Sequence, residues 1–546
     1  MTELQEIPST KSEEHRSSGN MKFRWKPGVL ILLLGAVAAL IARSVAPDQT
    51  FRVIFLYYII GTMLGLMTIW WMFASGLKFR FRIAGLLLFI LMAGLFIRFS
   101  IRDVYFEGDM RPRFRWKWEE HPAERTAEYL RKNAPVNPIP SGEPKLSDEV
   151  LMITDADWPR YCGWNSDRTV KEPRLSDAER DWKSNPPKEI WRHPAGEAWS
   201  SFAVVGERLY TQEQRGALEC VVCYSTETGK EIWRREDTAR YETPMGGIGP
   251  RATPTVTEDA VYALGATGLL NCLNPITGVL IWQKNIVADA GSEVLEWGMS
   301  GSPLVHGELL IVNAGGAQNR AVIAYDKKDG AIRWSAGNHK AGYSAPRTET
   351  INGQLQLLIF HGDGLLAADP SDGSRLWEYP WTNLYQINVA QPILTGNRIF
   401  ISSGYDSGCV LLDPTKIENG RPAEAWAPSK SLKLKFNEAV FSGGFVYGLD
   451  DGILCCIDVE SGERKWKGGR YRFGQILLWD DLLLIQAEQG DVALVKVSPE
   501  KFTEVTRFTA LNDRTWNVPV VCRGRLYVRN ADEVACFRLR SESSDK

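Results

Sequence analysis

The sequence predicts an all-β, eight-bladed propeller preceded by an N-terminal three-helix transmembrane segment. Two observations carry this prediction: a short pattern that recurs along the last two-thirds of the chain, and three long apolar stretches near its start. Repetition at a period of roughly 40 to 50 residues is typical of propellers and solenoids, and a helix needs about 20 apolar residues to cross a bilayer. The predicted organisation is a disordered cytoplasmic tail (1–26), a transmembrane region (27–102), a linker with a short helix (103–155), the propeller (156–540) and a polar tail (541–546).

The three apolar stretches cover about residues 28–46, 53–76 and 83–101, and no charge occurs from Val53 to Leu77. Basic residues flank the ends that would face the cytoplasm: Lys22, Arg24, Lys26, Lys78, Arg80 and Arg82. The positive-inside rule then puts the N-terminus inside and the propeller, after three crossings, outside. We expect a multi-pass protein of a bacterial inner membrane that contacts the lipid bilayer through these helices and whose propeller faces the periplasm. Whether the first stretch is cleaved as a signal peptide stays open.

The segment between the membrane and the propeller has three parts. The run 108–118 mixes cations with aromatic residues, and we expect it to lie at the membrane interface. Residues 119–133 predict a short polar helix, and the prolines at 135, 138 and 140 predict an extended linker.

Each repeat contains a small residue, a polar residue two positions later, a turn with Gly, and Trp at a fixed offset. The five clearest copies run from Cys223 to Trp233, Cys272 to Trp282, Ala324 to Trp334, Ala367 to Trp377 and Cys456 to Trp466. Alternating apolar runs precede the turns and predict β-strands, and Gly accepts the positive φ that hairpin turns need. The Trp is therefore predicted on the outer strand of a four-stranded blade.

Three degenerate copies complete the ring. One reaches Trp426 with five extra residues after Asp413, and one ends at Phe508 without a Gly turn. The last copy has no outer strand of its own, and Lys188–Trp191 is predicted to supply it, because such closure removes free sheet edges. The outer-strand aromatic residues at 191, 233, 282, 334, 377, 426, 466 and 508 then give eight blades.

These repeats resemble the tryptophan-docking motif of pyrroloquinoline-quinone (PQQ) type propellers. The segments Asp157–Asp167, Gly249–Pro254 and Gly298–Pro303 resemble PQQ-like propellers common in planctomycete bacteria. The family includes quinoprotein alcohol dehydrogenases and the propeller lipoprotein of the bacterial outer-membrane β-barrel assembly machinery. The resemblance covers roughly residues 155–540; it is specific for the fold and leaves the activity open.

The charge balance and the positions of the cysteines argue against two classes of function, nucleic-acid binding and metal or redox chemistry at cysteine. The chain carries 64 basic and 66 acidic residues, which argues against a nucleic-acid partner. Of the nine cysteines, Cys223, Cys272 and Cys456 occupy the position that Ala fills in other copies. We therefore expect small buried side chains there rather than metal ligands or redox pairs.

The candidate site lies where the chain enters the first strand of each blade. These segments, here called the mouth loops, meet at one end of the central channel. The candidate pocket residues are Arg251, Trp297, Ser300, Tyr343, Arg347, Asn388, Asn437, Glu438, Trp516 and Asn517. Trp or Tyr could stack on a flat ligand, and Arg251 or Arg347 could hold an anion. The alternative interpretation is that small residues and Asn only satisfy the backbone at tight turns.

Two functions follow, and the sequence leaves open whether the chain is an enzyme. The first is a membrane-anchored scaffold that binds a protein or a small ligand at the propeller mouth, in cell-envelope assembly. The second, implied by the resemblance, is a PQQ-dependent dehydrogenase that oxidises an alcohol or a sugar. It would need PQQ and Ca²⁺, for which Asn388, Asn437 and Glu438 offer oxygen ligands, and an Asp as general base. None of these candidate positions in the mouth loops is Asp, so no catalytic residue or metal site is identified and the scaffold is favoured.

Overall fold

The computed structural model describes residues 23–46, 48–133, 149–383 and 385–540, in two compact units, Met1–Asp103 and Val104–Lys546. The two predicted tails, up to residue 22 and from residue 541, lie outside the described residues, as does the proline-rich linker.

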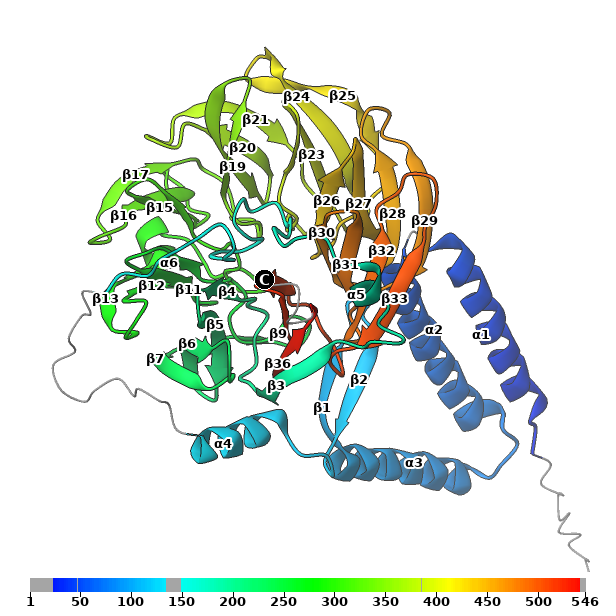
Figure 1. Cartoon of the computed structure of the whole chain (residues 1–546). Helices are drawn as coiled ribbons and strands as arrows, with labels where there is room; N and C mark the ends of the chain where they lie inside the picture. The colour runs from blue at the N-terminus through cyan, green and yellow to red at the C-terminus, as the bar shows by residue number, and fades with distance from the viewer. Residues whose placement is uncertain (1–22, 47, 134–148, 384, 541–546) are drawn as a thin grey trace, which may run out of the picture. The chain divides into compact units, whose positions relative to one another are not determined.

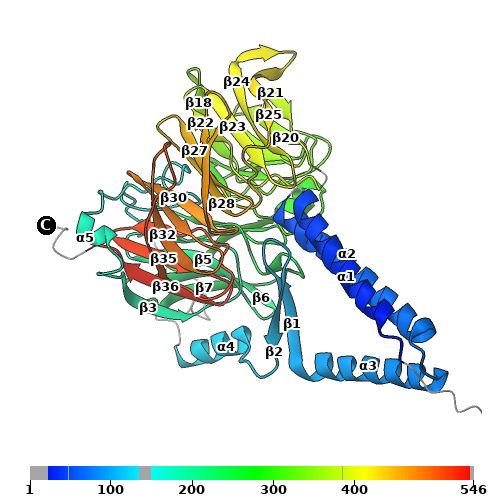
Figure 2. The ribbon, with the colours of Figure 1, turned by 90° about the vertical axis from the view of Figure 1, so that its right-hand side faces the viewer.

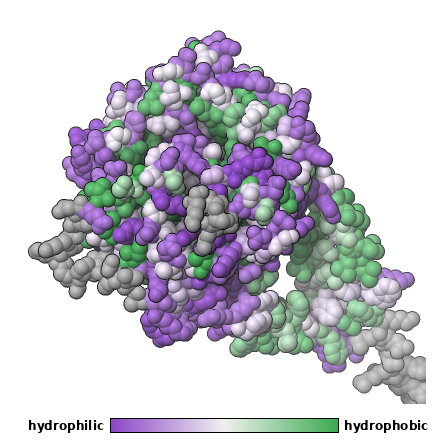
Figure 3. Space-filling model, viewed as in Figure 1, coloured by the Kyte–Doolittle hydropathy of each residue, from purple (hydrophilic) through white to green (hydrophobic). Residues whose placement is uncertain are grey.

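The first unit contains three long apolar helices. They are α1 (Lys26–Val45), α2 (Gln49–Ile69), which continues as the π-helical turn η1 (Trp70–Ala74), and α3 (Phe79–Ser100). All three are long and apolar enough to cross a membrane. The second helix begins earlier than expected because the Asp48 side chain caps it, accepting a hydrogen bond from the backbone nitrogen of Phe51 at 2.9 Å. Large apolar side chains are exposed along these helices, which are green in Figure 3.

The second unit is an eight-bladed propeller whose blades follow one another around a ring (Figure 1). From inner to outer strand, blade 1 consists of β4 (Ala203–Val205), β5 (Arg208–Arg215), β6 (Leu218–Ser225) and β7 (Glu231–Thr238), and blade 2 of β10 (Thr255–Val256), β11 (Val261–Leu264), β12 (Leu269–Leu273) and β13 (Leu280–Asn285). Blade 3 consists of β14 (Leu304–His306), β15 (Leu309–Asn313), β16 (Val322–Asp326) and β17 (Ile332–Ala336), and blade 4 of β18 (Arg347–Ile351), β19 (Gln354–His361), β20 (Gly364–Ala368) and β21 (Arg375–Pro380). Blade 5 consists of β22 (Ile393–Thr395), β23 (Arg398–Ser403), β24 (Gly408–Glu418) and β25 (Arg421–Ser429), and blade 6 of β26 (Ala439–Ser442), β27 (Phe445–Asp450), β28 (Ile453–Asp458) and β29 (Arg464–Arg470). Blade 7 consists of β30 (Gln475–Trp479), β31 (Leu482–Gln486), β32 (Asp491–Lys496) and β33 (Glu504–Thr509), and blade 8 of β34 (Val520–Cys522), β35 (Arg525–Arg529), β36 (Glu533–Arg538) and β3 (Lys188–Pro194).

The ring closes as the sequence predicts. Strand β3, which precedes the first complete blade in the chain, pairs antiparallel with β36 and supplies the outer strand of blade 8. Trp191 lies opposite Cys536 in this pair. The first and last segments of the propeller therefore share one sheet, and blade 8 has four strands like the other blades.

The repeat pattern is explained by one contact that recurs around the ring. Trp233 lies opposite Cys223 in its own blade and donates a hydrogen bond from Nε1 to the Pro275 carbonyl of the next blade, 3.2 Å away. A Cβ on Gly278 would lie 2.4 Å from the Trp233 ring. Trp191, Trp282, Trp334 and Trp426 pack in the same way on Gly229, Gly330, Gly373 and Gly462 of the blades that follow them. The small residue, the Gly and the Trp are thus three parts of one packing site.

Trp377 departs from this scheme, and the insertion in the next blade explains why. The Asp413 segment of blade 5 carries the extra residues and forms the long β24–β25 hairpin, and a Cβ on its turn residue Gly420 would meet no atom within 4 Å. Trp377 is fully buried and donates instead to the Gln356 side chain of its own blade at 2.8 Å.

All nine cysteines are buried free thiols. Burial raises the pKa of Cys223 to about 12, so the thiol is not reactive as a thiolate. Cys455 and Cys456 belong to different core clusters, on opposite faces of β28.

Two segments outside the blades cover the ends of the channel. The first is a hairpin of β1 (Ile101–Phe106) and β2 (Pro112–Trp116), followed by α4 (Pro122–Lys132), close to the short helix predicted for 119–133. The second precedes β3 and contains α5 (Asp177–Arg180). Figure 2 shows α5 and the β1–β2 hairpin on opposite sides of the propeller. The remaining short elements lie in mouth loops: β8 (Glu242–Thr243), β9 (Gly247–Ile248) and α6 (Ile286–Ala290).

Candidate functional site

The mouth loops bring aromatic side chains from many blades to one end of the channel. The rings of Trp199 and Trp516 have centroids 4.7 Å apart, and Phe436 lies 4.8 Å from Trp516. On the other side of the mouth, Trp297 lies 5.7 Å from Tyr343. The predicted residues Trp297, Tyr343 and Trp516 therefore all belong to an aromatic mouth.

One half of this mouth is filled by the turn of the β1–β2 hairpin, Glu107–Arg111, here called the plug turn. Glu107 and Asp109 are only 6% and 4% exposed. The Gly108 backbone nitrogen donates to Glu488 Oε1 at 2.7 Å, and Lys435 Nζ donates to the Gly108 carbonyl at 2.7 Å. A side chain at Gly108 has no space, because a Cβ would lie 2.4 Å from the Phe473 ring.

Charged groups hold the plug turn in place. Glu107 forms ion pairs with Arg472 of a mouth loop and, at 2.8 Å, with Arg113 of the hairpin. The Arg514 guanidinium lies 4.4 Å from the Trp516 ring centroid and donates to the Phe106 carbonyl. Since the Glu488 carboxylate also accepts from Trp516 Nε1 at 2.7 Å, it joins the plug turn to a predicted site residue. Burial raises the pKa of Glu488 and lowers that of Arg514.

We expected the run 108–118 at the membrane interface, but the structure buries its first residues in the channel mouth. No repeat signal could have revealed this, because the hairpin occurs once. Lys435, Glu488 and Arg514 were also missed, although Lys435 and Arg514 each lie two residues before a predicted residue of the same mouth loop.

Arg251 lies at the mouth and is held by its own loop. Its guanidinium stacks 4.6 Å from the Tyr241 ring centroid and donates to the carbonyls of Gly246 and Gly247 at 3.0 Å. Burial lowers its pKa to about 10. Ser300 Oγ donates to the Gly298 carbonyl at 3.1 Å within the next mouth loop.

The three predicted asparagines are buried and bonded to the backbone. Asn388 Nδ2 donates to the carbonyls of His361 and Trp381, while its Oδ1 accepts from Ser403 at 2.6 Å. Asn437 bridges the Lys435 nitrogen and the Leu449 carbonyl. Asn517 donates to Ala198 and Ser200. These contacts fix the shape of the mouth loops.

Arg347 and Glu438 point away from the aromatic mouth, toward the other end of the channel. Arg347 donates to the Pro392 carbonyl at 3.0 Å and pairs with Glu349. Glu438 accepts from Tyr161 at 3.0 Å, from the Gln391 nitrogen at 2.7 Å, and pairs with Arg168 at 3.3 Å. The structure therefore divides the predicted set between the two ends of the channel.

The residues present do not fit a PQQ–Ca²⁺ site. The oxygens proposed as Ca²⁺ ligands, on Asn388, Asn437 and Glu438, already accept hydrogen bonds from protein donors. Among the described residues, no group of three His, Cys, Asp or Glu is arranged to hold a metal ion. The plug turn also occupies half of the mouth through which a cofactor would pass.

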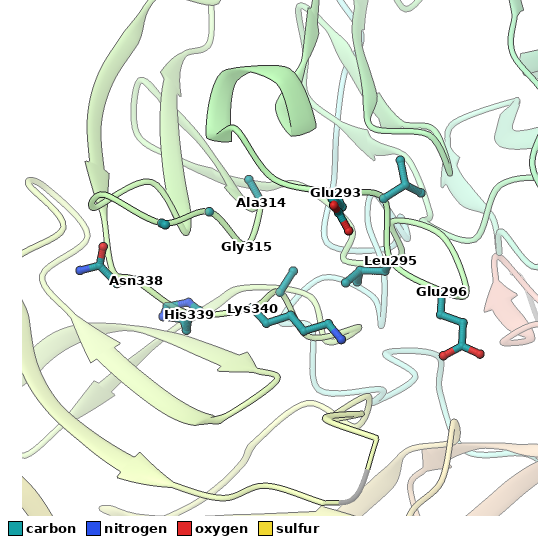
Figure 4. Close-up of a pocket in the computed structure, with 12 residues that line it drawn as sticks. Glu293, Leu295, Glu296, Ala314, Gly315, Asn338, His339 and Lys340 are labelled. Carbon is teal, nitrogen blue, oxygen red and sulfur yellow. The ribbon is translucent and has the colours of Figure 1, made fainter.

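A pocket of about 610 Å³ adjoins the open half of the mouth. It lies between the loops that precede β14, β16 and β18 (Figure 4). Glu293 and Glu296 come from the first of these loops and Lys340 from the last, with His339 at one end. Burial lowers the pKa of His339 to about 3, and its ring stacks on that of His361 with centroids 3.7 Å apart, so it stays neutral.

Comparison with known proteins gives the following relatives. A family model described as outer membrane protein assembly factor BamB matches residues 182–285 and 219–468, which together span more than half of the chain. Outer membrane protein assembly factor BamB of Burkholderia pseudomallei (strain K96243) is 22% identical over 301 residues, which cover 52% of this chain and 70% of the relative.

Among solved structures, quinohemoprotein alcohol dehydrogenase from Comamonas testosteroni matches 70% of this chain and 80% of its own, with a TM-score of 0.53 and 12% identity. A europium-containing methanol dehydrogenase matches 69% of this chain and 90% of its own, with a TM-score of 0.52 and 12% identity. At this identity the two enzymes support the fold alone.

Proposed function

The chain belongs to the family described as outer membrane protein assembly factor BamB, and from this premise we propose that it is a membrane-anchored scaffold that binds a protein partner at the open half of its propeller mouth. The propeller faces the periplasm, and the complex acts in assembly of the cell envelope. The description of the family and of the Burkholderia relative as an outer membrane protein assembly factor supports the last point.

The observation that carries the proposal is a row of aromatic side chains that the plug turn leaves uncovered. The row consists of Tyr343, Trp297, Tyr405 and Tyr385. Trp297 stacks on Tyr405 with ring centroids 6.4 Å apart, and Tyr405 lies 5.5 Å from Tyr385. Tyr385 is 49% exposed. Since Trp and Tyr provide much of the binding energy in protein interfaces, a row contributed by several blades suits a protein partner.

The charged residues beside the row suit the rim of such an interface. Glu293, Glu296 and Lys340 line the pocket next to Trp297 and are exposed. Polar rims around an apolar centre are typical of protein complexes that form and dissociate.

The three apolar helices support anchoring. Their length and composition match a bilayer, and basic residues flank the N-terminus of α1 and the turn before α3. By the positive-inside rule this distribution supports an extracytoplasmic propeller at the inner membrane.

The test is a comparison of variants in membranes. The double variant Trp297→Ala, Tyr385→Ala is expected to lose any protein that cross-links to the wild-type chain and co-purifies in mild detergent. The control is Trp118→Ala, which removes a Trp that is 69% exposed outside the mouth. Equal recovery with all three chains, or no specific partner with the wild type, would refute the proposal. Adding PQQ and Ca²⁺ with a redox dye tests the dehydrogenase alternative in the same preparation, and dye reduction by an alcohol would favour it.

A further inference from the structure

The end of the channel opposite the aromatic mouth contains a cavity that the proposed partner site does not use. Residues 157–172, here called the cover segment, cross this end and join the inner strands. The Trp158 nitrogen donates to the Val204 carbonyl at 2.8 Å, and the Leu478 nitrogen donates to the Arg168 carbonyl at 3.0 Å. The cover segment leaves a cavity of about 610 Å³ between itself and strands β14, β18, β22 and β26. Cavities of this size hold small-molecule ligands in many proteins.

Two of the three arginines that line the cavity are paired with acids. Arg168 is almost fully buried and forms an ion pair with Glu438 at 3.3 Å, and Arg347 pairs with Glu349. Their charges are therefore compensated within the protein.

Arg160 is different. Within the parts of the chain that the structure describes, its guanidinium forms no ion pair and no side-chain hydrogen bond, and its buried Nε has no partner. Burial lowers the pKa of Arg160, and no neighbouring charge offsets the effect. The Nε of Arg347, in the same cavity wall, is also buried without a partner. Arg160 as a whole is partly buried. Buried guanidinium nitrogens in proteins normally have partners, because removing such a charged donor from water without one is costly.

The rest of the lining combines apolar side chains with polar ones that suit a polar molecule. Asn165, Ser166 and Thr169 come from the cover segment, and Thr348 and Thr350 from β18. These side chains can donate to and accept from a ligand without adding charge.

We propose that the cavity binds a small polar ligand with an oxyanion group, a carboxylate or a phosphate, which the unpaired Arg160 guanidinium holds. A guanidinium presents parallel N–H donors that match either group. This site lies at the other end of the channel from the aromatic row and does not depend on the proposed partner.

The test uses the full-length protein in detergent and isothermal titration with four anions: inorganic phosphate, phenyl phosphate, acetate and benzoate. We expect saturable binding of at least one anion and a roughly 10- to 100-fold weaker affinity in Arg160→Gln, the range for loss of charge-assisted hydrogen bonds. The matched control is Arg174→Gln, because Arg174 is exposed, paired with Asp481 at 3.2 Å and outside the cavity. Binding of the phosphates alone assigns a phosphate ligand, and binding of the carboxylates alone assigns a carboxylate.

A second variant keeps the test decisive if Arg160→Gln does not fold. Thr350→Phe fills the cavity from β18 and leaves Arg160 intact, and it should also abolish binding. Absence of saturable binding in the wild type, or unchanged affinity in the variants that fold, would overturn the proposal.

Discussion

Replacing Gly108 by Ala should release the plug turn from the channel mouth. The backbone at Gly108 is not in the left-handed region, so Ala adds no backbone strain there. The added Cβ would lie 2.4 Å from the Phe473 ring and 2.8 Å from the Phe436 ring, closer than real contacts allow. The rings or the turn must shift, and a shift of the turn breaks the bonds from Gly108 to Glu488 and Lys435.

The size of the effect follows from these contacts. Overpacking costs about 1 to 3 kcal/mol, and each lost hydrogen bond to a charged group about 1.5 to 3 kcal/mol. Because the turn can move to relieve one cost at the expense of the other, we expect a loss of about 2 to 4 kcal/mol in the free energy that keeps the turn docked.

Native-state hydrogen exchange measures this loss at the amides of Glu107 and Met110, which are hydrogen-bonded within the turn. Their exchange should accelerate roughly 30- to 1,000-fold at about 1.36 kcal/mol per tenfold change. The control is Arg111→Gln, which removes only a half-exposed ion pair with Asp109 and should change exchange less than about fivefold. Unchanged protection in Gly108→Ala would refute the assignment of this turn to the mouth.

Two further predictions concern the blades. Gly278→Ala places a Cβ 2.4 Å from the Trp233 ring at a positive φ, so it should lower the free energy of unfolding by about 2 to 5 kcal/mol. The control is Gly206→Ala, which has a positive φ but open space around the Cβ, and which should lower the free energy of unfolding by only about 1 to 2 kcal/mol. Equal losses in urea unfolding would show that Trp docking does not matter. Burial raises the pKa of Glu219 to about 7 from an ordinary value of 4.5. The folded state therefore binds the proton more tightly, and stability falls as the pH rises from 4.5 to 7, by roughly 3 kcal/mol. Burial raises the pKa of Glu197 to about 7 as well, which adds a similar fall of its own. Glu219→Gln should therefore remove only the Glu219 contribution, roughly 3 kcal/mol, from the total fall in stability between pH 4.5 and 7, and an unchanged pH profile would contradict the assignment.

The propeller could be predicted from the sequence because its packing repeats. Trp233 needs a small residue opposite it and a Gly in the next blade. Because the same requirement recurs around the ring, each such contact produces the same sequence motif. The closure of the ring by β3 was predicted by counting these motifs, because the last copy had no outer strand of its own. The exception at Trp377 was visible only as an insertion, since the replacement partner, Gln356, belongs to no repeated position.

The mouth was predicted in its position but not in its contents. Arg251, Trp297 and Trp516 were assigned to the mouth because the repeat fixes where each inner strand begins. The side chains that touch them depend on the path of segments that occur once. Gly108 comes from the hairpin before the propeller, and no spacing in the repeats connects it with Glu488, 380 residues away. For the same reason, Arg160 could not be recognised as an unpaired cation from its sequence context.

The segments before the first blade therefore decide which parts of the channel a ligand or partner can reach. A propeller that began at residue 156 would lack the plug turn, so Arg472 would lose Glu107 and Lys435 would lose the Gly108 carbonyl. Trp516 and Phe436 would be uncovered beside these two cations, and an acidic or aromatic molecule could bind at the surface that the plug turn covers. Such a fragment would have a larger and more basic mouth than the chain with its plug turn. Ligand affinities measured on the fragment would therefore include binding to the surface that the plug turn covers. Binding to the aromatic row alone has to be measured on the chain that includes the plug turn.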